Sequence, residues 1–214
     1  MKLLKRISLV LCVLIIAGSL VAADWPNWRG VNYDGISTEK DWNPAALKDA
    51  KILWSNDDIG TGFSTISVAD GRVYTMGNTD DKDTVFCFDA DNGNVLWKHT
   101  YETPLAPKYY KGGPSATPTI SEGKVYTMSK KGEVFCLNAK TGNVIWDTVL
   151  PGKLPTWGLA GSALVTDDLV IFNAATRGVA LNKKDGSIKW QNGKGAAGYS
   201  TAVPCKYKGK DAVV

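Results

Sequence analysis

The sequence has few of the residues on which most metal and nucleophile chemistry depends. It contains one histidine, His99, and four cysteines, which form no CxxC motif, no adjacent pair and no CxxCH haem-attachment motif. A histidine-rich metal centre and a c-type haem are therefore excluded, and a serine–histidine catalytic triad is disfavoured.

An excess of charge of one sign is also missing from most of the chain. The formal net charge is +4, but residues 1–23 contain Lys2, Lys5 and Arg6 and no acid, so the remaining residues carry only +1. Most of the net positive charge thus lies in residues 1–23, and we expect no nucleic-acid partner. Aromatic residues, by contrast, make up 10% of the chain and include eight tryptophans, which excludes a disordered chain.

Residues 1–23 have the three-part pattern of a secretory signal peptide, with cleavage expected after Ala23. Basic residues precede an apolar run, and the small residues 21–23 come before Asp24. The alternative is an uncleaved anchor, although Ile7–Ala23 lies at the lower limit of length for a membrane span. We therefore predict an exported protein, periplasmic or extracellular, with no stable transmembrane anchor after cleavage.

A motif ending in tryptophan occurs three times without gaps, at residues 87–97, 136–146 and 180–190. Each copy has a small residue, then Asp or Asn, then Gly, then Trp, at the same spacing. An earlier Trp54 continues the series, so that successive tryptophans are 43, 49 and 44 residues apart. A period in the forties with strand-forming residues is typical of β-propeller blades. The shared positions are Cys87, Asp89, Gly93 and Trp97; Cys136, Asn138, Gly142 and Trp146; and Ala180, Asn182, Gly186 and Trp190.

Repeated segments upstream of the motif complete each blade. Asp70–Met76 matches Glu122–Met128, and inner strands are expected before them. The prediction is an all-β fold, a partial β-propeller of four-stranded antiparallel blades over residues 52–214, preceded by an N-terminal extension, 24–51. The expected blades span about 63–97, 115–146 and 161–190, with part of a fourth at 199–214; their inner strands are expected at Thr65–Val68, Thr117–Ile120, Ser162–Val165 and Tyr199–Val203.

The blade count predicts about half of an eight-bladed ring, because eight blades would need roughly 360 residues. We expect a fragment of a longer gene product; the alternative is that two copies pair to close the ring. Ile52–Trp54 is predicted to be the outer strand that would close the last blade.

Each shared residue of the motif has a local physical role. Asp or Asn at the start of a turn accepts hydrogen bonds from nearby backbone N–H groups, and Gly adopts a left-handed conformation without steric cost. The Trp is expected to be buried in the gap between neighbouring blades. Cys87 and Cys136 take the place that Ala180 has in the third copy, so we predict small, buried, unpaired thiols.

The repeat resembles the tryptophan-docking motif of the pyrroloquinoline-quinone (PQQ) propellers, usually Ala-x-Asp-x-x-Thr-Gly-x-x-x-Trp. The opening Asp24–Gly30 also resembles the start of exported bacterial proteins of this superfamily that have no assigned function. The resemblance implies the propeller fold but two kinds of function. Some members oxidise alcohols or sugars with PQQ and calcium, whereas others are cofactor-free, including the propeller lipoprotein of the outer-membrane assembly machinery.

The enzyme branch has requirements that this sequence does not visibly meet. The resemblance implies a disulfide between adjacent cysteines, Glu and Asn ligands to calcium, and an Asp base, and none can be matched to a residue here. We therefore assign no catalytic, cofactor-binding or metal residue and expect no cofactor. The leading hypothesis is a non-enzymatic binding or scaffold module with a protein, small-ligand or glycan partner. The alternatives are a PQQ- and calcium-dependent dehydrogenase with part of its site beyond residue 214, and a glycan-binding or glycan-processing accessory domain.

Long loops between blades are the candidate binding surface. Residues 98–114 and 147–160 carry aromatic and basic side chains where the mouth of a propeller channel is expected: Tyr109, Tyr110, Lys111 and Trp157. The alternative is that these loops only cover a neighbouring blade. The acidic run Asp80–Asp83 is interpreted as a solvated turn, because it lacks the spaced ligands of a calcium site.

Overall fold

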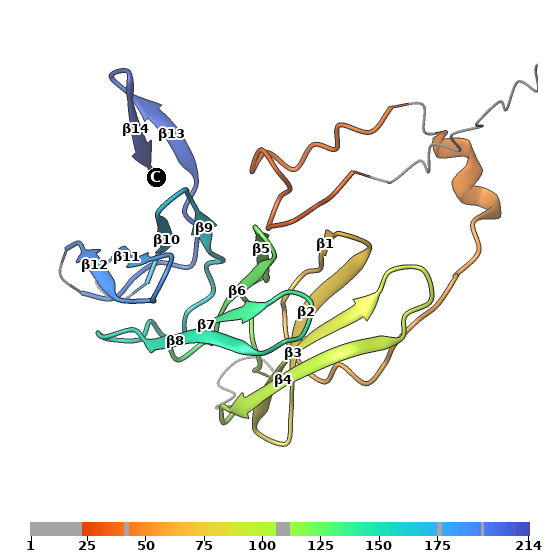
Figure 1. Ribbon diagram of the computed structural model, residues 1–214, viewed down its shortest axis with the longest axis horizontal. Helices are drawn as coiled ribbons and strands as arrows, with labels where there is room; N and C mark the ends of the chain where they lie inside the picture. The colour runs from red at the N-terminus through yellow and green to blue at the C-terminus, as the bar shows by residue number, and fades with distance from the viewer. Residues whose placement is uncertain (1–22, 41–42, 106–111, 175–176, 194) are drawn as a thin grey trace, which may run out of the picture.

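The computed structural model describes residues 23–40, 43–105, 112–174, 177–193 and 195–214. These residues form three four-stranded antiparallel sheets, a two-stranded sheet and one short 3-10 helix, η1 (Pro44–Asp49), as Figure 1 shows. The predicted all-β, partial-propeller fold is confirmed. Residues 1–22 of the expected signal peptide, and Tyr109, Tyr110 and Lys111 of the expected binding surface, lie outside the described residues.

Each four-stranded sheet is a meander in which consecutive strands pair, so each is one blade. The first contains β1 (Ser67–Ala69), β2 (Arg72–Thr79), β3 (Lys82–Asp89) and β4 (Val95–Glu102). The second contains β5 (Thr119–Ser121), β6 (Lys124–Met128), β7 (Glu133–Asn138) and β8 (Val144–Val149). The third contains β9 (Leu164–Val165), β10 (Leu169–Phe172), β11 (Val179–Asn182) and β12 (Ile188–Gln191), and the last sheet is the hairpin of β13 (Pro204–Tyr207) and β14 (Lys210–Val213).

The turn between the first two strands of a blade explains the repeated acidic-Gly pair. Asp70 and Gly71 have φ of 51° and 68°, and Glu122 and Gly123 have φ of 49° and 70°. Two consecutive left-handed residues are the requirement of a type I′ hairpin turn, whose twist matches that of the strands. The acidic-Gly pair therefore determines where the inner strand reverses in the first two blades.

The core lies between successive sheets, not within one of them. One cluster joins Tyr74, Met76 and Cys87 of the first blade to Val125 and Leu137 of the second. A second cluster joins the second blade to the third. Each sheet thus buries its apolar side chains against the next, and the blades stabilise one another in a series.

Two strand predictions are wrong. The first strand of the last hairpin is Pro204–Tyr207 and not Tyr199–Val203, which forms no strand although Thr201 and Ala202 are buried. Ile52–Trp54 also forms no strand. Val203 exchanges backbone hydrogen bonds of 2.8 and 3.0 Å with Val214 and so only extends the hairpin. Residues 199–202 and Ile52–Trp54 have no such ladder among the described residues, and strand-forming side chains alone do not make a strand.

The N-terminal extension contacts the inner strands of all three blades. Trp25 and Val68 exchange backbone hydrogen bonds of 2.8 and 2.9 Å, and the N–H of Ile120 donates to Pro26 O at 2.7 Å. Further along, Tyr33 packs against the cluster that contains Leu164. Residues 25–33 are therefore part of the folded structure, which the repeat pattern alone did not predict.

Candidate binding surface at the blade junctions and inner strands

The three copies of the motif form the same turn. In the first, Asp89 Oδ1 accepts from the backbone N–H groups of Asp91 and Asn92 at 3.0 and 3.2 Å, and Gly93 N–H donates to Asp89 O at 2.9 Å. Asn138 and Asn182 accept equivalent bonds in the other copies. The turn glycines Gly93, Gly142 and Gly186 have φ of 72°, 72° and 73°, which Gly adopts without steric cost.

A tryptophan from the preceding part of the chain packs onto each of these glycines. A Cβ on Gly142 would lie 2.6 Å from the ring of Trp97, and one on Gly186 would lie 2.5 Å from the ring of Trp146. Trp54 lies on Gly93 in the same way. Each indole N–H also donates to a backbone carbonyl in the motif it covers: Ala90 O at 2.9 Å, Ala139 O at 3.0 Å and Lys183 O at 3.0 Å.

The expected burial of the docking tryptophans is correct for two of the three. Trp97 and Trp146 are only 8% and 7% exposed, whereas Trp190 is 41% exposed. The prediction for Trp190 is wrong because the hairpin that follows it, β13–β14, does not present a docking turn to the indole. Instead, Trp190 lines two cavities of about 290 and 510 Å³ between the third blade and this hairpin.

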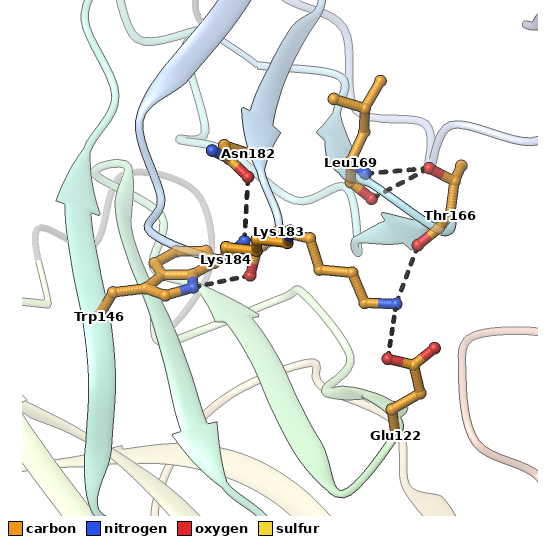
Figure 2. Close-up of polar contacts among 7 residues, drawn as sticks. All are labelled: Glu122, Trp146, Thr166, Leu169, Asn182, Lys183 and Lys184. Carbon is orange, nitrogen blue, oxygen red and sulfur yellow. Dashed lines mark hydrogen bonds and ion pairs between the residues drawn. The ribbon is translucent and has the colours of Figure 1, made fainter.

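The junction of the second and third blades has an additional charged contact, shown in Figure 2. Lys183 stands where the other motifs have Ala90 and Ala139. Its stem is buried, and its Nζ donates to Thr166 O at 3.0 Å and pairs with Glu122 at 3.2 Å. A long side chain therefore crosses from the docking turn of the third blade to the inner turn of the second.

Cys87 and Cys136 are buried and unpaired, as predicted. Each lies opposite a buried tyrosine in the sheet, Tyr74 and Tyr126 respectively. Burial raises the pKa of each of the two thiols to about 11, so both are neutral at physiological pH. They fill space as the equivalent Ala180 does in the third blade.

Hydroxyl groups connect the beginnings of the inner strands. Thr65 Oγ1 and Thr117 Oγ1 share a hydrogen bond of 2.8 Å, Thr117 N–H donates to Ser162 Oγ at 2.8 Å, and Ser162 N–H donates to Thr201 Oγ1 at 3.0 Å. These four residues occupy matching positions in four successive repeats. We call them the hydroxyl belt. It joins adjacent blades through neutral groups, and the hydrogen bonds among these residues are not predictable from the sequence alone.

Trp157 is the one residue of the predicted binding surface within the described residues. It lies in the loop after β8, is half exposed, and its ring centroid is 5.4 Å from that of Tyr199. Its backbone N–H donates to Tyr199 Oη at 3.4 Å. The loop that follows the second blade is thereby held against the loop that follows the third.

The interpretation of Asp80–Asp83 as a solvated turn is wrong at its last residue. Asp83 is fully buried in β3, where Asn78 Nδ2 donates to its Oδ1 at 2.7 Å and to Thr103 O at 2.9 Å. Burial raises the pKa of Asp83, and the Asn78 bond and the Lys130 charge oppose that shift. The buried carboxylate is part of the junction between the first two blades, and alternation along β3 was the signal that could have found it.

The donors of the described residues do not fit the calcium of a quinoprotein. No three His, Cys, Asp or Glu side chains in the described parts of the chain come together as a metal ion would require. Asp89 and Asp185 accept hydrogen bonds within their own turns, and the inner-strand ends carry hydroxyls. We therefore derive no catalytic step through PQQ or calcium. No helix in the described ranges has the length and apolar character needed to cross a bilayer.

Successive four-stranded meanders, linked by tryptophans on glycine turns, define a β-propeller of the PQQ-like repeat class. A family profile described as outer membrane protein assembly factor BamB matches residues 81–212, which is more than half of the chain. The chain belongs to this family. None of the curated proteins matches it.

Two dehydrogenases of known structure have the same fold over most of this chain. The quinohemoprotein alcohol dehydrogenase from Comamonas testosteroni is 24% identical with a TM-score of 0.61, covering 79% of this chain and 27% of that protein. A europium-containing methanol dehydrogenase is 17% identical with a TM-score of 0.60, covering 80% of this chain and 32% of its own. BamB from Moraxella catarrhalis is 17% identical with a TM-score of 0.46, covering 73% and 44%. The chain thus spans between a quarter and a third of the two dehydrogenases.

Proposed function

We propose that the protein is an exported, non-enzymatic β-propeller module that binds or holds a partner. The observation that carries this proposal is the hydroxyl belt. Thr65, Thr117, Ser162 and Thr201 bond to one another and to backbone N–H groups, so the inner strands form a rigid, neutral frame. Rigid frames that display loops are typical of binding modules. The family description, an assembly factor, supports a scaffold role.

The surface that this frame displays is suited to a protein, small-ligand or glycan partner. The half-exposed Trp157 and Tyr199 lie on adjacent loops, and aromatic side chains with accessible faces are enriched in binding surfaces. The signal-peptide pattern of residues 1–23 supports export, and partners in the periplasm or outside the cell.

The alternative, a PQQ-dependent dehydrogenase, would need a different use of the carboxylates. Such an enzyme needs a carboxylate base within reach of the substrate hydroxyl and a divalent ion to polarise the quinone carbonyl. The described carboxylates at the motif and junction serve the fold instead: Asp89 and Asp185 hold their turns, and Asp83 is buried between blades. These structural roles of the carboxylates favour a binding function over substrate oxidation.

Reconstitution separates the two functions. The full-length protein is incubated with PQQ and calcium, binding is measured by isothermal titration, and dye-linked oxidation of alcohols and aldoses is followed, with a quinoprotein dehydrogenase as the positive control. We expect neither stoichiometric binding nor turnover. Stoichiometric PQQ binding, with turnover that a chelator abolishes, would reject the scaffold proposal in favour of a dehydrogenase.

A further inference from the structure

A cavity of about 460 Å³ lies between the N-terminal extension and the inner edge of the first blade. Two indoles, one guanidinium and one hydroxyl contribute to its lining: Trp25, Trp28, Arg29 and Thr65, together with Ile66. The size is in the range of small-ligand sites, and few polar groups accompany a largely apolar wall, as such sites require. Neither the docking repeat nor the proposed scaffold role accounts for Trp25, Trp28 and Arg29.

The extension is folded into a fixed shape at this cavity. The N–H of Gly30 donates to Asn27 O at 3.0 Å, and the N–H of Gly35 donates to Arg29 O at 2.9 Å. Gly30 has φ of 75°, and a Cβ there would lie 2.8 Å from the ring of Trp25. The backbone bonds between Trp25 and Val68 then attach this turn to β1. The site is therefore pre-organised, which reduces the entropic cost of binding.

Arg29 is held in place but its charge is not neutralised. It has φ of 64°, a conformation uncommon outside glycine. Its Nη2 donates to Asp34 O at 3.0 Å, and its guanidinium carbon lies 5.4 Å from the ring centroid of Trp28. None of the ion pairs formed among the described residues involves Arg29. The Asp34 carbonyl and the Trp28 indole are both neutral partners. The guanidinium therefore keeps its positive charge and has N–H donors left for an anion.

We propose that this cavity binds a sugar ring that carries a carboxylate, that is, a uronic acid residue of an acidic glycan. The planar guanidinium of Arg29 matches a carboxylate in a bidentate geometry. Indole faces such as those of Trp25 and Trp28 accommodate the apolar C–H face of a sugar ring. Thr65 Oγ1 shares one hydrogen bond with Thr117 Oγ1 and, whichever of the two donates, keeps a lone pair that can accept from a sugar hydroxyl. This inference rests on the proposed function, because it names the partner class of a binding module.

The test is titration of the full-length protein with trigalacturonic acid, with galactotriose as the neutral comparator, by calorimetry and tryptophan fluorescence. We expect saturable binding of the acidic trisaccharide alone, weakened by salt. Arg29→Gln should weaken it about tenfold or more, because a charge-assisted hydrogen bond is lost. Trp28→Ala should weaken it to a similar extent, and Lys189→Gln, an exposed cation on β12 outside the cavity, should not change it. Thermal unfolding checks each fold, and Trp28→Phe substitutes for Trp28→Ala if that variant unfolds.

Three outcomes would overturn the proposal. They are no saturable binding, equal binding of galactotriose, and binding that Arg29→Gln and both Trp28 variants leave unchanged. The reconstitution with PQQ is read independently. If PQQ does not bind and trigalacturonic acid does not either, the scaffold proposal stands and only the uronic acid is rejected. If PQQ binds with turnover, the scaffold proposal fails whatever the trisaccharide does.

Discussion

Trp146 and Trp190 occupy the same position in the repeat but have different environments. Trp146 is covered by the docking turn of the third blade, with its indole N–H on Lys183 O, and only 7% of it is exposed. Trp190 lies beside a two-stranded hairpin and two cavities and is 41% exposed. The motif therefore does not bury its own tryptophan. The next repeat does, so the stabilising unit is the junction between two blades and not the blade.

The largest expected effect is loss of a covered tryptophan. Trp97→Ala and Trp146→Ala should each lower the free energy of unfolding by about 3–5 kcal/mol, because a large buried ring leaves a cavity. Trp190→Ala, the matched substitution at the uncovered position, should cost about 1 kcal/mol or less. Urea unfolding of the three variants measures this. Equal costs at Trp146 and Trp190 would show that the junction does not determine the stability.

A turn glycine under an indole should also be less tolerant than one in open space. Gly142→Ala should cost about 2–4 kcal/mol, since a left-handed alanine is strained and its Cβ would overlap the Trp97 ring. Gly123→Ala has a similar φ but nothing within 4 Å, so strain alone should cost about 1–2 kcal/mol. Thermal and urea unfolding compare the two variants. Identical destabilisation would mean that the indole moves aside freely.

Sequence reasoning succeeded where an interaction is local and repeated. The acidic-Gly turns, the docking turns and the burial of Cys87 and Cys136 depend on neighbouring residues, and each occurs more than once. It failed for interactions that depend on a distant partner. Trp190 ends a complete copy of the motif, but no docking turn covers it. Asp83 belongs to a run of residues typical of a surface turn, and its burial becomes evident only when β3 is placed against the second blade.

The candidate site divides in the same way. The hydroxyl residues of the belt lie in the segments expected to be inner strands, but their mutual bonding can be inferred only once the blades are placed side by side. The contacts of Trp25, Trp28 and Arg29 with the first blade have no repeat to reveal them, because the extension occurs once. Of the predicted surface, Trp157 can be placed, and it lies against Tyr199.

The junction of the first two blades should respond to pH through Asp83. Burial raises the pKa of this carboxyl above its ordinary value of 3.8, so the folded protein holds the proton more tightly than the unfolded chain does. This contribution to stability is present at low pH and is lost as the pH rises through the raised pKa. Asp83→Asn should therefore stabilise the protein more, relative to the native chain, at pH 7 than at pH 4. The charges of Lys130 and Glu133 and the hydroxyl of Tyr101 face Asp83, and all three are unchanged in the variant.

Urea unfolding at the two pH values measures that difference. The same relative stability of Asp83→Asn at pH 4 and pH 7 would contradict the prediction.

The smallest expected effects are those of two ion pairs, one of them at the second junction. Glu122→Gln should lower the free energy of unfolding by about 0.5–1 kcal/mol, because Lys183 is buried but the Glu122 side chain is largely exposed and solvent screens the pair. Glu102→Gln removes an ion pair with Lys82 in which both side chains are at least half exposed, and it should cost less. Denaturation in low and high salt compares them, and a larger effect at Glu102 would reverse the assigned order.

The N-terminal extension has a consequence for how the chain folds. Each blade is built from contacts between residues close in sequence, which form quickly. Residues 25–33 instead join inner strands as far along the chain as Leu164, and such long-range closures carry a larger entropic cost before any contact is gained. Residues 25–33 should therefore reach their native positions only after the third blade has formed. Refolding should end with a slow phase that Trp25 and Trp28 report.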